Sequence, residues 1–153
     1  MKNHFWTIIV ILLFFGCDNQ KEVNENKQNF EKTWWKEGIL YQIYPQSFKD
    51  TDGDGFGDFK GVIEKLDYVE SLGVNMVWMN PFFESPLVDN GYDVADYRAI
   101  HPRYGTMEDF QTMLDGFHER DVKFVLDVVV NHSSNEHEWF KQASSSRDNK
   151  YYN

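Results

Sequence analysis

Residues 122–132 have the sequence Val-Lys-Phe-Val-Leu-Asp-Val-Val-Val-Asn-His, and this stretch decides the fold class. Its apolar residues predict a strand over 122–130 that is covered on both faces, as in a parallel sheet. Asp127 is the only acid in that strand, and a buried carboxylate is costly unless it is paired. His132 follows at the carboxyl end, where parallel α/β folds place their sites. Asp127 and His132 are therefore candidate site residues, although a lone His is often a satisfied core or surface residue.

Strands and helices alternate upstream of this stretch. Strands are predicted over 39–44 and 74–79, each ended by a proline or Asn-Pro. Apolar residues at three- and four-residue spacing predict a helix over 59–72, which Gly73 ends. Thr106 caps a second helix that runs to Arg120, with Asp109 at the capping-box position. This βαβαβ order predicts an α/β fold with right-handed crossovers.

An acidic loop, Asp50-Thr51-Asp52-Gly53-Asp54-Gly55-Phe56-Gly57-Asp58, precedes the first helix. Alternating carboxylates with glycines between them can surround a hard cation with oxygen atoms. The expected ligands of a structural Ca²⁺ are the side chains of Asp50, Asp52, Asp54 and Asp58 and the Phe56 carbonyl. The alternative is a solvated acidic turn at a helix N-terminus, which the helix dipole also favours.

A second candidate site is Asp89-Asn90-Gly91-Tyr92-Asp93, within a loop of about twenty-five residues, a length that is usually functional in a compact domain. An aromatic ring can cover the apolar face of a sugar while carboxylates accept hydrogen bonds from its hydroxyls. A turn with exposed polar residues explains the same pattern.

The composition limits the function. The chain has 153 residues with 15 Lys+Arg against 25 Asp+Glu, a net charge of -10, which argues against binding to nucleic acid. Aromatic residues make up 17%, too many for a disordered acidic tail. Cys17 is the only cysteine, so no intrachain disulfide can form.

The N-terminus is typical of an export signal. Lys2 is followed by an apolar run from Phe5 to Phe15, shorter than the roughly twenty residues that span a bilayer. Residues 1–16 are therefore predicted to be a lipoprotein signal peptide, with Cys17 as the lipidated residue after Gly16. An ordinary signal peptide with a stray cysteine is the alternative. Residues 17–33 are polar and predict a flexible tether, so the protein is expected to be an exported bacterial lipoprotein, facing the periplasm or anchored at the cell surface.

Taken together, residues 34–153 resemble the N-terminal part of the α-amylase family of glycoside hydrolases. Asp127–His132 is similar to the first conserved region of that family. Tyr41-Gln42-Ile43-Tyr44-Pro45, the acidic loop, Asp89–Asp93 and Asn135–Phe140 resemble its oligo-1,6-glucosidase and α-glucosidase branch. Two departures stand out: Gln46 replaces a common Arg, and Met79-Asn80-Pro81 replaces the usual Leu-Ser-Pro.

The resemblance implies the first three βα units of a (β/α)₈ barrel and a retaining mechanism on α-glucan oligosaccharides. It implies that Tyr92 stacks on the terminal sugar, His132 holds its primary hydroxyl, Asp89 binds its non-reducing end, and Asp127 supports the pocket floor.

The family's three catalytic carboxylates lie on later strands, so no catalytic pair is expected here and the chain alone is expected to be inactive. An endo-acting α-amylase and a non-catalytic, membrane-anchored binding protein on the same scaffold remain open alternatives, and trehalose synthases and sucrose isomerases share these motifs.

Overall fold

The computed structural model describes residues 33–152, and the chain divides between Gly38 and Ile39 into two units. In the first unit, residues 33–37 are helical, and Trp35 is exposed with the ammonium group of Lys36 over its ring. The second unit starts at Ile39, whereas the sequence placed the start of the folded part at Trp34. The signal peptide, Cys17 and the tether up to residue 32 lie outside the described residues.

Parallel strands form the sheet of the second unit. They are β1 (Leu40–Ile43), β2 (Met76–Met79) and β5 (Lys123–Leu126), in the order β1-β2-β5. Ile43 pairs with Met79, and Met79 pairs with Leu126, so the strands end in step. The residues that follow the strands therefore emerge at one edge of the sheet.

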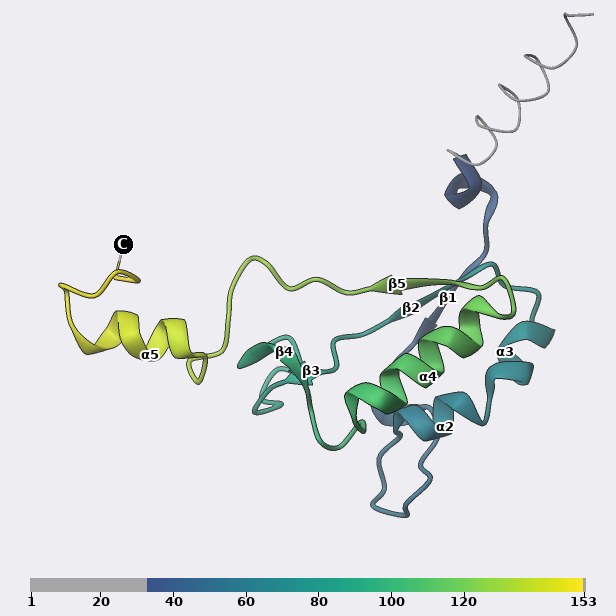
Figure 1. Ribbon diagram of the computed structural model, residues 1–153, viewed down its shortest axis with the longest axis horizontal. Helices are drawn as coiled ribbons and strands as arrows, with labels where there is room; N and C mark the ends of the chain where they lie inside the picture. The colour runs from purple at the N-terminus through teal and green to yellow at the C-terminus, as the bar shows by residue number, and fades with distance from the viewer. Residues whose placement is uncertain (1–32, 153) are drawn as a thin grey trace, which may run out of the picture. The chain divides into compact units, whose positions relative to one another are not determined.

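Helices α2 (Phe59–Ile63), α3 (Leu66–Ser71) and α4 (Met107–His118) lie on one side of this sheet (Figure 1). Thr106 caps α4 with the predicted capping box, in which Asp109 is the reciprocal partner. The prediction of a single helix over 59–72 is wrong, because a turn at residues 64–65 separates α2 from α3. Gly116 of α4 packs closely there: a Cβ at Gly116 would lie 2.3 Å from Leu66 Cδ1.

The core lies between the sheet and these helices. Its buried residues come from β1, β2, α2, α3, α4 and the segments beside them: Ile43, Phe59, Val62, Leu66, Val69, Val77, Met79, Phe82, Tyr104, Met113, Phe117 and Val122. The prediction that both faces of the third strand are covered is wrong for the described residues, since Val125 and Leu126 are 38% and 36% exposed. The physical reason is that β5 is an edge strand here, with helices packed against one face only.

The third strand is also shorter than predicted. β5 ends at Leu126, and Val128 and Val130 beyond it are exposed. Asp127 is thus the first residue after the strand and is half-buried rather than buried inside it. This position removes most of the desolvation cost that a carboxylate inside a strand would carry.

Four short elements lie where the sequence predicted none. The long loop contains an antiparallel hairpin of β3 (Phe83–Glu84) and β4 (Asp96–Ile100), and α5 (Glu138–Ser145) follows β5. A 3₁₀ turn, η1 (Pro45–Ser47), follows β1. Within residues 33–152, every helix is too short or too polar to cross a membrane.

Candidate functional site

The carboxyl edge of the sheet brings together the candidate residues of the second and third sequence motifs. Asp127 follows β5, and Tyr92 reaches it from the turn between β3 and β4. The Tyr92 hydroxyl donates a hydrogen bond of 2.8 Å to Asp127 Oδ2 and accepts one of 3.2 Å from Asn80 Nδ2. Burial raises the pKa of the Tyr92 phenol, and the adjacent Asp127 carboxylate raises it further. The phenol therefore stays protonated and keeps its bond to Asp127.

His132 lies on the other side of Tyr92. Its Nε2 is 3.0 Å from the Tyr92 carbonyl oxygen. Because a carbonyl only accepts, Nε2 carries the proton in this contact. The His132 carbonyl in turn accepts a 2.8 Å bond from the Tyr97 hydroxyl of β4. The backbone of His132 is thereby tied to the same hairpin that carries Tyr92.

An open pocket of about 470 Å³ lies at this edge. Its lining residues come from the ends of β1 and β2 and from the hairpin turn: Gln42, Tyr44, Asn80, Asp89, Asn90 and Tyr92. Asp89 and Tyr92 thus face one pocket. Asp127 and His132 do not line it and instead hold the hydroxyl and the carbonyl of Tyr92.

The turn that carries Asp89 is built around Asp93. One carboxylate oxygen of Asp93 accepts from Ser85 Oγ at 2.7 Å and from the Asp89 amide at 3.2 Å, and the other accepts from the Val88 amide at 2.9 Å. Burial opposes ionisation of Asp93, but these hydrogen bonds outweigh it and lower the pKa. Gly91 passes close to Pro81, where a Cβ would lie 2.8 Å from the carbonyl oxygen. Asp93 is therefore a structural acid that fixes Asp89.

Sequence reasoning missed Asn80, Gln42 and Asn90 as site residues. Asn80 directly follows β2 and Gln42 lies in β1, so their place near the carboxyl ends of two predicted parallel strands was the available signal. Their side-chain contact, Gln42 Nε2 to Asn80 Oδ1 at 2.9 Å, depends on the register of β1 against β2.

The acidic loop gathers three of its four predicted carboxylates. Ligand oxygens of Asp50, Asp52 and Asp58 lie within 4.8 Å of one another, whereas Asp54 is not part of this group. Asp54 instead accepts a 2.8 Å bond from the Phe56 amide. The Phe56 ring lies under the guanidinium of Arg103, whose central carbon is 3.8 Å from the ring centre.

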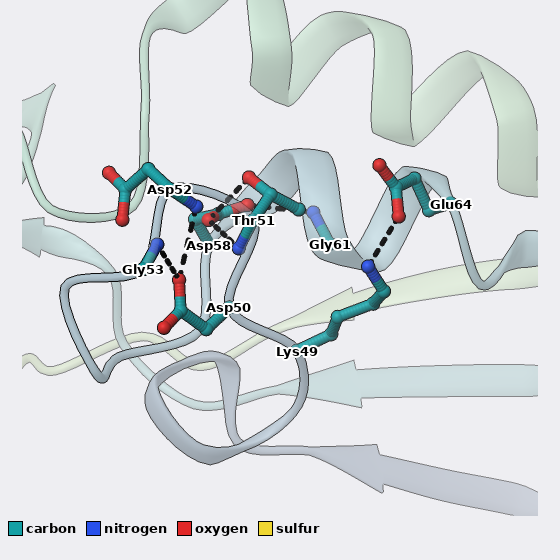
Figure 2. Close-up of polar contacts among 8 residues, drawn as sticks. All are labelled: Lys49, Asp50, Thr51, Asp52, Gly53, Asp58, Gly61 and Glu64. Atoms are coloured by element: carbon teal, nitrogen blue, oxygen red, sulfur yellow. Dashed lines mark hydrogen bonds and ion pairs between the residues drawn. The ribbon is translucent and has the colours of Figure 1, made fainter.

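Backbone amides orient the converging carboxylates (Figure 2). Asp50 accepts from the Gly53 amide at 2.7 Å and the Gly55 amide at 2.9 Å, and these bonds hold its pKa below the ordinary value. Asp58 caps α2 by accepting from the Gly61 amide and also accepts from Thr51. Three carboxylates held together by amides form an oxygen-rich donor set that suits a hard cation.

A parallel sheet with helices on one face and polar side chains at its carboxyl edge defines an α/β protein, and the first βα units of a TIM barrel have this arrangement. Residues 42–153 match the family described as alpha amylase, catalytic domain, so the chain belongs to the α-amylase family. The resemblance noted in the sequence is thereby confirmed.

The relatives place the chain near the predicted branch. It is 54% identical over 121 residues to an oligo-1,6-glucosidase of Parageobacillus thermoglucosidasius. The aligned region covers 79% of this chain and 22% of the relative. It is 55% identical over 118 residues to a trehalose-6-phosphate hydrolase of Bacillus subtilis (strain 168), covering 77% and 21%.

Among solved structures, the isomaltulose synthase of Protaminobacter rubrum matches with a TM-score of 0.76 and 53% identity, over 78% of this chain and 21% of that chain. The chain therefore spans about a fifth of the length of these relatives.

Proposed function

We propose that the whole protein carrying this chain is a retaining α-glucoside hydrolase of the α-glucosidase or oligo-1,6-glucosidase type. Its substrates would be oligosaccharides derived from starch or dextran. The observation that carries the proposal is the joint placement of Asp89 and Tyr92 in one pocket, with Tyr92 held by Asp127 and His132. A ring and a carboxylate on one pocket wall suit a terminal sugar, which offers an apolar face and several hydroxyl donors.

Each of these residues has a distinct part in the proposal. The Tyr92 ring covers the apolar face of the terminal glucose, and Asp89 accepts hydrogen bonds from its non-reducing end. Asp127 keeps the Tyr92 ring in place through its hydroxyl, and His132 holds the Tyr92 backbone through its carbonyl. A carboxylate at the end of the pocket leaves no room for a further sugar, which favours release of single glucose units over internal cleavage.

The test is the variant Asp89→Ala in the whole protein, assayed on maltose and isomaltose. We expect kcat/KM to fall roughly ten- to a hundredfold, because a charge-assisted hydrogen bond is lost. Asp96→Ala, which removes an exposed carboxylate of the same hairpin, is the matched control and should keep wild-type kinetics. Unchanged efficiency of Asp89→Ala, or shortening of long starch chains before glucose appears, would favour an endo-acting α-amylase.

A second candidate is sugar isomerisation, which the similarity to an isomaltulose synthase favours. Incubation of the whole protein with sucrose distinguishes the two functions. A hydrolase releases glucose and fructose, whereas an isomerase yields a disaccharide of unchanged composition.

We also propose that the acidic loop holds a structural Ca²⁺. Support comes from the convergence of the Asp50, Asp52 and Asp58 carboxylates, a group that does not include the Asp54 carboxylate or the Phe56 carbonyl predicted from the sequence. A bound cation would offset the repulsion among these acids and stabilise the folded state by mass action. Asp52→Asn should abolish the calcium-dependent rise in Tm, whereas Asp115→Asn on α4 should keep it. A wild-type Tm that is the same in calcium and in chelator would contradict the proposal.

The membrane anchor is a proposal supported by the sequence alone. Cys17 follows a short apolar run and Gly16, the arrangement expected of a lipidated cysteine. Cys17→Ser should move the protein from the membrane fraction to the soluble fraction of bacterial cells. Unchanged membrane association would exclude lipidation of Cys17.

A further inference from the structure

A row of hydrogen bonds crosses the carboxyl edge of the sheet from β1 to β5. Gln42 Nε2 donates to Asn80 Oδ1 at 2.9 Å, and Asn80 Nδ2 donates to the Tyr92 hydroxyl at 3.2 Å. The Tyr92 hydroxyl then donates to Asp127 Oδ2 at 2.8 Å. Asn80 uses both ends of its amide, and among residues 33–152 it links the β1 side of this row to Tyr92.

The Asn80 amide determines which groups donate and which accept along this row of hydrogen bonds. A tyrosine hydroxyl has one proton and two acceptor lone pairs. Because the Asn80 amide group occupies a lone pair, the single proton of Tyr92 remains available to Asp127. An aspartate at position 80 would have no donor and would compete with Asp127 for that proton.

We propose that Asn80 is a positioning residue for the sugar pocket and acts through the Tyr92 hydroxyl. This inference rests on the proposed function, because Tyr92 is the ring on which the terminal glucose would stack. Asn80 and Asp127 hold the hydroxyl from two sides, which fixes the angle of the ring in the pocket that also contains Asp89. Loss of Asn80 leaves Tyr92 with fewer constraints, so part of the binding energy of the sugar is spent on ordering the ring.

The experiment uses the whole protein with maltose as substrate. The variants are Asn80→Ala, Asn80→Asp, Tyr92→Phe and the double variant Asn80→Ala/Tyr92→Phe. Asn75→Ala is the matched control, because Asn75 precedes β2 at its amino end and accepts a 3.0 Å bond from the Ile39 amide, away from the pocket. Kinetics are measured for each protein, and thermal unfolding of the same proteins reports the contact without any need for activity.

We expect Asn80→Ala to raise KM about three- to tenfold, the size expected for the loss of one neutral hydrogen bond. Little change in kcat is expected, because the lost contact stabilises the bound substrate and the transition state equally. Asn80→Asp should raise KM at least as much, although it keeps the shape of the side chain. In the Tyr92→Phe background, Asn80→Ala should add less than about a twofold change, since the hydroxyl through which it acts is gone.

Other outcomes separate the inference from the proposed function. A KM of Asn80→Ala equal to that of Asn75→Ala, or an effect that persists undiminished in the Tyr92→Phe background, overturns the positioning role. Additive losses in Tm for Asn80→Ala and Tyr92→Phe refute the contact itself. A wild-type protein without activity on α-glucosides, combined with coupled Tm losses, refutes the proposed function and the sugar-binding role while the contact stands.

Discussion

Asp93 offers the sharpest test of how the pocket is built. Its carboxylate accepts three hydrogen bonds, from Ser85, Val88 and Asp89, within the turn that carries Asp89. Asp93→Ala removes all three. We expect the turn to lose about 2–4 kcal/mol, because bonds to a charged group contribute about 1.5–3 kcal/mol each and solvent screening reduces the total for a half-buried group.

Asp93→Asn should have an intermediate effect for a geometric reason. The same oxygen, Oδ1, accepts from Ser85 and from Asp89, so an asparagine with its oxygen there keeps both bonds. Its amide group then faces the Val88 amide, which loses its acceptor. The expected order of stability is therefore wild type, Asp93→Asn, Asp93→Ala.

The pH dependence of these variants follows from the direction of the pKa shift. The pKa of Asp93 is lowered in the folded state, so the carboxylate stabilises the fold above the ordinary Asp value of about 3.9 and the contribution disappears as the pH falls through the folded pKa. The difference in unfolding free energy between wild type and Asp93→Asn should be constant near neutral pH. It should shrink below about pH 4, where protonation of Asp93 makes the wild type resemble the amide.

Urea denaturation and limited proteolysis measure the effect of these variants on the whole fold and on the turn. Denaturation reports the global stability, and new cleavage around residues 87–92 reports local opening of the turn. Asp96→Ala is the control, since that carboxylate accepts only from the Arg98 amide in the described structure, at 2.8 Å. If Asp93→Ala is no less stable and no more readily cleaved than Asp96→Ala, Asp93 does not hold the turn.

Three further predictions concern other contacts. Tyr97→Phe, which keeps the ring but removes the bond to the His132 carbonyl, should raise KM for maltose about threefold or more, and the effect should vanish in a His132→Ala background. Gly116→Ala should lower stability by about 1–3 kcal/mol in denaturation, because its Cβ would lie 2.3 Å from Leu66 Cδ1; an unchanged midpoint would show that Leu66 moves aside freely. Thr106→Ala should cost about 0.5–2 kcal/mol through loss of the α4 cap, whereas Thr106→Ser should recover most of it.

The elements that could be predicted from the sequence are those with local causes. The capping box at Thr106 depends on residues three positions apart, and the order of the parallel strands follows from long apolar runs separated by helical patterns. The hairpin β3–β4 was missed because β3 has only two residues and gains its structure from pairing with β4. The break between α2 and α3 likewise accompanies the close approach of α4 at Gly116, which lies far along the chain.

The candidate site shows the same division. Asp89, Tyr92, Asp127 and His132 were candidates from residue type, motif and family resemblance, and the structure places the other three near Tyr92. The hydrogen bonds that join them could not be predicted, because these depend on which side-chain atoms meet.

The position of Asp127 connects the fold to the proposed activity. Inside a strand, this carboxylate would need a full set of buried partners, but one residue past β5 it is half-buried and takes a single phenol as donor. The partner is available because β2 and β5 end in step, which places Asn80 beside Asp127 and lets both reach one tyrosine hydroxyl. The strand register thus determines the orientation of the Tyr92 ring, and the ring in turn shapes the pocket that Asp89 shares. A substitution that moves the end of β2 or β5 by less than one residue step should therefore weaken the proposed sugar pocket before it unfolds the core, since the apolar contacts of β2 with the helices tolerate small displacements that a hydrogen bond of 2.8 Å does not.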